Sequence, residues 1–113
     1  MSRRNALTAS TPFDVERAIK GLGANLRVAR LRRNLTLAEV AEKIGVSRYV
    51  VAHAESGKVS TAIAVYSGLL WTYGLLDQFT ELADPAKDRE GLALSLAHER
   101  TNARRTDALD NDF

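Results

Sequence analysis

Apolar residues recur at helical intervals along most of this chain, and the strict alternation typical of β-strands is almost missing. Leu22, Leu26 and Ala29 are spaced at i, i+4 and i+7, which predicts one apolar face of an α-helix that ends near Asn34. The opposite side of the same helix carries several arginines. This periodicity favours an all-α fold.

Proline and glycine mark the expected limits of the first helical segments. Thr11 is followed by Pro12, an N-cap residue and a first-turn proline that together predict a short helix through Ile19. Gly21 and Gly23 come next, and we expect them to separate this short helix from the one that follows.

A second group of capping signals predicts two short helices joined by a tight turn. Thr36 and Glu39 have the spacing of a capping box, and Gly45 is placed to end that helix in the left-handed conformation. Ser47 follows after one further residue and is a candidate N-cap for the next helix, which Gly57 closes. A helix, a turn and a second short helix are therefore expected here.

Two more helices are predicted after this motif. Residues 61–73 are largely apolar and stop at Gly74. Asp77 is a candidate N-cap for a fifth helix, which ends at Asp84 because a proline follows it.

The remaining segment, residues 87–113, has an ambiguous pattern. Leu92, Leu94 and Leu96 alternate as they would in a strand, whereas the alanine and leucine content permits a helix. Both interpretations stay open, and we expect the chain beyond Asp107 to be disordered.

The polar residues of the second short helix suggest what the motif does. Because the two helices cross at a steep angle, the outer positions of the second helix project from the domain. Ser47, Arg48, Tyr49 and His53 occupy those positions, which is the recognition-helix geometry of DNA-binding helix-turn-helix proteins. Arg48 is the strongest candidate for reading a base, since arginine can bind O6 and N7 of guanine together.

A wider set of residues carries a resemblance to a known family. They are Leu22, Leu26 and Arg30, then Leu35, Thr36, Glu39, Ala41, Ile44, Gly45, Val46 and Ser47, then Val51, Glu55 and Gly57. The stretch from Leu22 to about Leu76 resembles the Cro/CI (XRE) family of helix-turn-helix regulators. The resemblance implies a five-helix, lambda-repressor-like domain with a C-terminal extension, in which Arg30 pairs with Glu55.

This resemblance divides the chain and suggests its DNA contacts. We expect a flexible N-terminal arm (1–10), a helix-turn-helix DNA-binding domain (11–84) and a partly disordered C-terminal extension (85–113). The expected base contacts are Arg48, Tyr49 and His53, and the expected phosphate contacts are Thr36, Ser47, Lys58 and Arg27.

Two positions depart from the family's pattern. Many members have glutamine where this chain has Leu37, so the phosphate contact at that position falls to Thr36 and the backbone amides. Ala54 is smaller than the usual isoleucine or leucine, so either the recognition helix packs closer or another helix supplies the bulk.

The region from Gly68 to Leu94 is similar to the end of HipB-like antitoxins, which are encoded beside HipA-type kinases. Its sequence is GLLWTYGLLDQFTELADPAKDREGLAL. This resemblance implies that the protein regulates its own operon and binds a HipA-like toxin kinase.

Four aromatic residues, Tyr66, Trp71, Tyr73 and Phe79, are too many for so small a core, so some should lie at an interface. We expect a homodimer that reads a pseudopalindromic operator. Core packing is the alternative for Tyr66 and Trp71. The candidate dimer contacts are Leu75, Leu76 and Phe79.

Charge is divided unevenly along the chain. Residues 1–60 contain 11 basic and 5 acidic residues, a net charge of +6, and residues 61–113 contain 5 and 9, a net charge of −4. This split is expected if the first half of the chain binds a polyanion and the second half binds a different partner.

Other function classes find little support. The chain has no cysteine, no phosphate-binding glycine loop, no two-histidine metal motif and no catalytic motif, so we expect neither an enzyme nor a metal or cofactor site. No apolar run approaches the roughly 20 residues of a membrane-spanning helix, which favours a cytoplasmic protein. The sequence therefore predicts a sequence-specific repressor that binds double-stranded DNA and is the antitoxin and autoregulator of a toxin–antitoxin operon. A stand-alone XRE-type regulator without a toxin partner and a helical protein-interaction adaptor are the alternatives.

Overall fold

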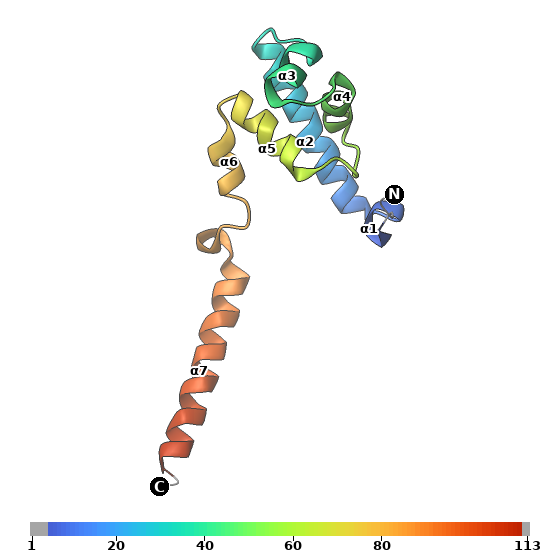
Figure 1. The fold of residues 1–113 in the computed structure, drawn as a ribbon. Helices are drawn as coiled ribbons and strands as arrows, with labels where there is room; N and C mark the ends of the chain where they lie inside the picture. Colours follow the sequence, from blue (N-terminus) through green and yellow to red (C-terminus); the bar gives the residue numbers. More distant parts are fainter. Residues whose placement is uncertain (1–4, 112–113) are drawn as a thin grey trace. The chain divides into compact units, whose positions relative to one another are not determined.

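The computed structural model describes residues 5–111, and the side chains of residues 5–107. All regular elements in this range are helical (Figure 1), which confirms the predicted all-α fold. The chain divides into two compact units, one ending at Phe79 and one beginning at Thr80. The helices are α1 (Ala6–Ala9), α2 (Phe13–Arg32), α3 (Leu37–Ile44), α4 (Arg48–Ser56), α5 (Ile63–Thr72), α6 (Leu76–Thr80), the 3-10 turn η1 (Pro85–Lys87) and α7 (Arg89–Asn111).

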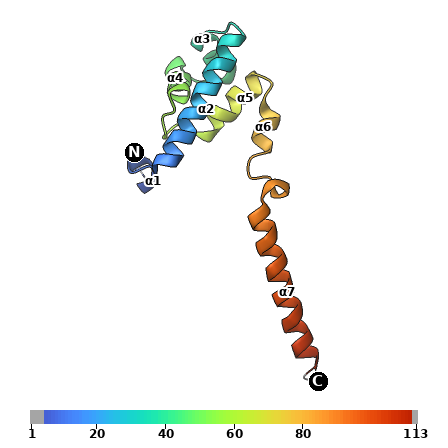
Figure 2. The same cartoon turned by 180° about the vertical axis from the view of Figure 1, so that it is seen from behind.

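The long helix α2 shows that the expected break at the two glycines is wrong. Helix α2 runs without interruption from Phe13 to Arg32, and α4 packs against it (Figures 1 and 2). Gly21 is exposed, whereas Gly23 is buried beneath α4. The packing of α4 against this part of α2 favours a continuous helix and outweighs the weak helix propensity of glycine, which costs only about 1 kcal/mol relative to alanine.

The capping signals of the helix-turn-helix segment are confirmed. Thr36 and Glu39 form a reciprocal capping box at the start of α3. Ser47 accepts a hydrogen bond from the backbone N–H of Val50 at the start of α4. Gly45 and Gly57 end the two helices with φ of 75° and 76°, the left-handed conformation that glycine adopts without steric cost.

The core of the first unit lies between α2, α3, α4 and α5. Its most deeply buried large side chains are Leu26, Val40, Val51 and Leu69. Helix α5 is apolar on nearly every side, which is typical of a helix packed against several neighbours.

The aromatic residues divide differently from the expectation. Tyr66 and Tyr73 are buried, and Phe79 is half-buried against the core. The alternative of core packing is therefore confirmed for Tyr66. It is wrong for Trp71, whose side chain on α5 is 58% exposed. Tyr66 and Tyr73 lie seven residues apart on the core-facing side of α5, while Trp71 falls on its outer side.

The segment after α5 differs in detail from the prediction. Asp77 lies inside α6 and does not precede it, and α6 ends at Thr80, short of Asp84. Asp84 instead caps the 3-10 turn, where its side chain accepts a hydrogen bond of 2.9 Å from the backbone N–H of Ala86.

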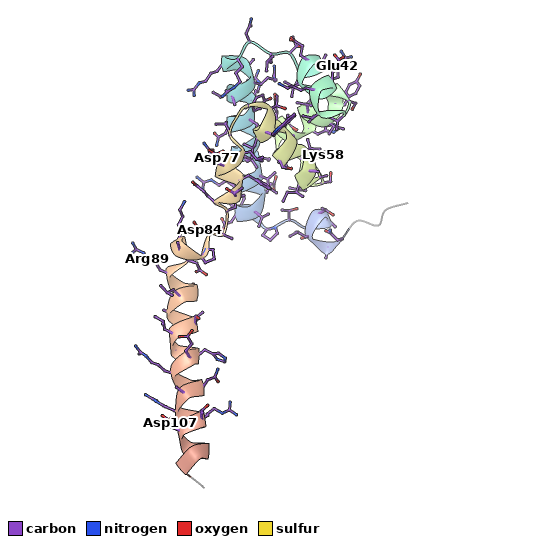
Figure 3. All side chains as sticks on the ribbon, turned by 60° about the vertical axis from the view of Figure 1, so that its left-hand side comes forward. Glu42, Lys58, Asp77, Asp84, Arg89 and Asp107 are labelled. Atoms are coloured by element: carbon purple, nitrogen blue, oxygen red, sulfur yellow. The ribbon has the colours of Figure 1, made fainter. Side chains whose placement is uncertain are left out.

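Helix α7 resolves the ambiguity of the C-terminal segment. Residues 89–111 are helical, so the strand interpretation is wrong, and the backbone stays helical beyond Asp107, where disorder was expected. Figure 3 shows side chains projecting from all sides of α7, and every residue from Leu92 to Asp107 is exposed. Among residues 5–111, no helix is both long enough and apolar enough to cross a bilayer.

Candidate nucleic-acid interface

The outer side of α4 presents a mostly polar face. Arg48, Tyr49 and His53 are all exposed on it. On the opposite side of the same helix, Val51 and Ala54 are fully buried, with 0% exposure. This division follows from the 3.6-residue helical period, which places positions one, two and six of the helix on one side. The three residues expected to contact bases therefore share one accessible surface.

A buried ion pair holds α4 against α2. Arg30 Nε donates to Glu55 Oε2 at 2.7 Å and Arg30 Nη2 donates to Glu55 Oε1 at 2.9 Å, so the guanidinium binds the carboxylate with two parallel hydrogen bonds. Both side chains are more than nine-tenths buried. A third hydrogen bond, from Arg30 Nη1 to the carbonyl oxygen of Leu35 at 2.9 Å, connects the ion pair to the turn just before α3. The hydrogen bonds to Glu55 raise the pKa of Arg30 above its ordinary value.

Two glycines allow α4 to approach α2 at backbone distance. A Cβ atom on Gly23 would lie 2.5 Å from the carbonyl oxygen of Ala54, and one on Gly57 would lie 2.6 Å from Cα of Lys20. Neither position has room for a side chain. The small Ala54 therefore accompanies a close helix contact, the first of the two arrangements that its size suggested.

Arg48 and Tyr49 contact each other at the start of α4. Arg48 Nη2 donates to the phenolic oxygen of Tyr49 at 3.3 Å. The guanidinium carbon also lies 5.2 Å from the centre of the tyrosine ring, within the range of a cation–π interaction. The contact therefore limits the conformations of two side chains that are both exposed.

A hollow beside His53 gathers further polar groups. It is lined by Val50, His53, Lys58, Ser60 and Thr61, together with Ala62 and Val65 at the start of α5. Lys58 lies in the turn between α4 and α5 (Figure 3). The hydroxyl oxygen of Thr61 is buried and has no hydrogen-bond partner within the described part of the chain.

Sequence reasoning missed Ser60 and Thr61 as members of this group. The available signal was a pair of hydroxyl residues directly before an apolar helix. Helix α5 begins after Ala62, and no side chain caps its N-terminus. The N–H of Val65 donates to the carbonyl oxygen of Ala62, so the N–H groups of Ile63 and Ala64 are the donors available to an anion.

The other expected phosphate contacts lie on different elements. Arg27 is exposed and borders a hollow with Leu37, Ala52 and Ser56. Leu37 itself is half-buried against the core, so its side chain has a packing role. Thr36 and Ser47 are exposed at the starts of α3 and α4, where each side chain caps its own helix.

Arg33 contributes to the scaffold. It donates hydrogen bonds of 2.9 Å to the carbonyl oxygens of Ala29 and Tyr73 and lies 5.5 Å from the centre of the Tyr73 ring. Burial raises the pKa of Tyr73 to about 12, and the negative charge of Glu55 adds to this effect. This arginine fastens the end of α5 to the end of α2.

The remaining expected residues lie elsewhere in the first unit or outside the described residues. Leu75, Leu76 and Phe79 are half-buried and pack against the core of their own chain. Within the expected N-terminal arm, residues 6–9 form α1, and residues 1–4 lie outside the described residues.

The fold and this exposed α4 surface define a helix-turn-helix DNA-binding protein. A family model described as a helix-turn-helix domain matches residues 21–82, more than half of the chain, and the protein belongs to that family. Comparisons with curated proteins and with solved structures found no match.

Proposed function

We propose that this protein is a sequence-specific transcriptional repressor that binds double-stranded DNA in the cytoplasm and blocks a promoter. The observation that carries the proposal is the exposed face of α4, where Arg48, Tyr49 and His53 lie on a helix whose other face is buried and ion-paired. Placed in the major groove, this face brings long donor side chains to the base edges.

Phosphate contacts would flank the recognition helix on two sides. Lys58, Ser60 and Thr61 line the hollow beside His53, while Arg27 borders α4 near Ser56. Thr36 and Ser47 add the starts of two helices, where backbone N–H groups and the helix dipole favour an anion. These groups position the protein on the duplex without reading sequence.

The protein would act as a homodimer on a pseudopalindromic operator, because helix-turn-helix dimers read half-sites that are about 34 Å apart. Leu75, Leu76 and Phe79 remain our candidates for the dimer contact, since each keeps part of its apolar surface accessible. Light scattering of the purified chain would give its mass in solution directly. A monomer at the concentration that saturates operator DNA would rule out this part of the proposal.

The similarity of residues 68–94 to HipB-like antitoxins supports a more specific role. In that role the protein represses its own operon and binds a HipA-like toxin kinase. Purification of the tagged chain from its native host, followed by identification of bound proteins, tests this. Recovery of a kinase supports the antitoxin role, and DNA binding without a kinase partner would indicate the stand-alone regulator.

Two substitutions separate base reading from phosphate binding. We expect Arg48→Ala to reduce discrimination at one base pair by about 1–3 kcal/mol, because it removes a bidentate base contact. Lys58→Ala should weaken binding to all sequences alike and lower the salt slope by about one ion.

Titrations on a selected operator and on a scrambled duplex measure both effects. Arg100→Ala removes the same charge from the exposed helix α7 and is the matched control. If Arg48→Ala weakened both duplexes equally, Arg48 would not read a base. A complete lack of salt-dependent DNA binding by the unaltered protein would instead favour the protein-interaction adaptor.

A further inference from the structure

The contact between Arg48 and Tyr49 joins two residues that stand side by side in the sequence. Neighbouring residues on a helix do not face each other, so the arginine must fold back across the surface to reach the tyrosine. It does so with a hydrogen bond of 3.3 Å and with its guanidinium over the ring at 5.2 Å. Both side chains are exposed, so the core does not impose this conformation on them.

We propose that Arg48 and Tyr49 form one base-reading unit, in which Tyr49 positions the guanidinium of Arg48. The unit selects a guanine followed by thymine or guanine, the two bases that offer an acceptor and no amino donor in the major groove. This inference rests on the proposed function and specifies the DNA sequence that the same site would prefer.

The chemistry of the contact determines this preference. The phenolic oxygen of Tyr49 accepts from Arg48, so the free hydrogen of the hydroxyl group points away as a donor. Arginine has only donors, and the tyrosine oxygen already accepts from Arg48, so the pair presents chiefly donors to the groove. Guanine offers the O6 and N7 acceptors to Arg48, and either thymine O4 or a second guanine can accept from Tyr49.

The wrong bases would meet this unit with a donor of their own. Cytosine presents only its N4 amino group in the major groove, and adenine presents its N6 amino group beside the N7 acceptor, so we expect both to bind the pair less well than thymine or guanine. A thymine at the second position has the added advantage that its methyl group can contact the tyrosine ring. We therefore expect a guanine–thymine or guanine–guanine step within each half-site.

The value of the tyrosine lies in limiting the motion of the arginine before binding. A free arginine side chain loses conformational freedom when it is fixed at a base, and prior positioning reduces that loss. A cation–π contact at an exposed site is worth about 0.5–1 kcal/mol. Removing the ring should therefore lower the preference for guanine over adenine by about two- to fivefold.

The experiment begins with selection of binding sites by the unaltered full chain from a library of random DNA duplexes. Fluorescence anisotropy then measures the affinities of variants for the selected duplex and for duplexes with either base replaced. Tyr49→Ala should lower the guanine-to-adenine affinity ratio about two- to fivefold. Tyr49→Phe keeps the ring but removes the phenolic oxygen that accepts from Arg48. It should therefore lower the preference at the second base about two- to fivefold, and lower the guanine-to-adenine ratio by less than Tyr49→Ala does.

A double-mutant cycle separates positioning from an independent contact. In an Arg48→Ala background, Tyr49→Ala should leave the guanine-to-adenine ratio unchanged, because no guanidinium remains to be positioned. Arg100→Ala on α7 controls for loss of charge. Circular dichroism verifies that each variant is folded, which we expect because both side chains are exposed.

The possible results are distinct. Selection of a guanine–thymine or guanine–guanine step, together with non-additive effects of the Arg48 and Tyr49 substitutions, supports the proposed unit. Selection of a sequence without such a step, or additive effects of the two substitutions, overturns the unit and leaves the proposed function intact. If no sequence is enriched from the library, the proposed function fails, and this inference fails with it.

Discussion

Two glycines that lie two residues apart in α2 should respond in opposite directions to the same substitution. Gly21 is exposed, and a Cβ atom there meets nothing within 4 Å. Gly21→Ala should therefore stabilise the protein by about 0.5–1 kcal/mol, because alanine loses less backbone entropy in a helix. For a domain of this size that corresponds to a rise in Tm of about 2–8 °C.

Gly23→Ala gives the same gain in helix propensity, but the structure has no space for the added methyl group at this position. Its Cβ atom would lie 2.5 Å from the carbonyl oxygen of Ala54 and 2.6 Å from that of Glu55. Both oxygens belong to the backbone of α4, so the two helices would have to separate by about 0.5–1 Å to reach an ordinary contact distance. Overpacking of this kind costs about 1–3 kcal/mol, and a clash with backbone atoms belongs at the upper end of that range. After the propensity gain of about 1 kcal/mol, a net loss of up to about 2 kcal/mol is expected.

Urea unfolding followed by circular dichroism measures both variants against the unaltered protein. The displacement of α4 should also weaken DNA binding in Gly23→Ala, while Gly21→Ala keeps its affinity. Equal stabilisation by the two substitutions would refute the reasoning, since it would mean that α4 does not rest on the backbone of α2 at Gly23.

Three other perturbations test separate parts of the structure. Glu55→Gln should destabilise the domain by about 3–5 kcal/mol in urea unfolding, because it leaves the buried charge of Arg30 uncompensated. The double variant Arg30→Met/Glu55→Leu should recover much of that loss. A small effect of Glu55→Gln alone would contradict the burial of the pair. The pKa of Tyr73 is raised from 10.0 to about 12, so folding favours the neutral form of its side chain. The contribution of this group to the free energy of unfolding is present below pH 10 and is lost as the pH rises from 10 to 12. Tyr73→Phe should flatten this alkaline decline in Tm, and an unchanged decline would assign it to other groups. Truncation after Asp84 should preserve operator affinity, since the first compact unit ends at Phe79, and should weaken capture of any toxin partner; a large loss of DNA affinity would show that the second unit takes part in binding.

The local signals in the sequence predicted the local structure well. Thr36, Gly45, Ser47 and Gly57 act through hydrogen bonds and backbone angles within a few residues of themselves, so their effects can be read without knowing the rest of the fold. Gly23 was misinterpreted because its role depends on α4, about thirty residues away in the sequence. A glycine that breaks a helix and one that admits a neighbouring helix look the same in a sequence.

The candidate site was also predictable only where its residues depend on local structure. The helical period alone brings Arg48, Tyr49 and His53 to one face, and the structure places them there. The hollow that collects Ser60 and Thr61 beside His53 depends on the path of the turn between α4 and α5. Trp71 could not be told from Tyr73 by composition, because α5 is apolar on nearly every side and only the packing decides which aromatic is covered.

The two faces of α4 have a consequence for how this protein could acquire new targets. The groups that fix the helix, Glu55 and the backbone above Gly23, are on its inner side and its C-terminal half. The side chains of Arg48, Tyr49 and His53 contribute nothing to the core. A change in operator preference can therefore accumulate at these three positions without a stability cost that must be compensated elsewhere, which makes the domain a suitable starting point for the design of altered DNA specificity.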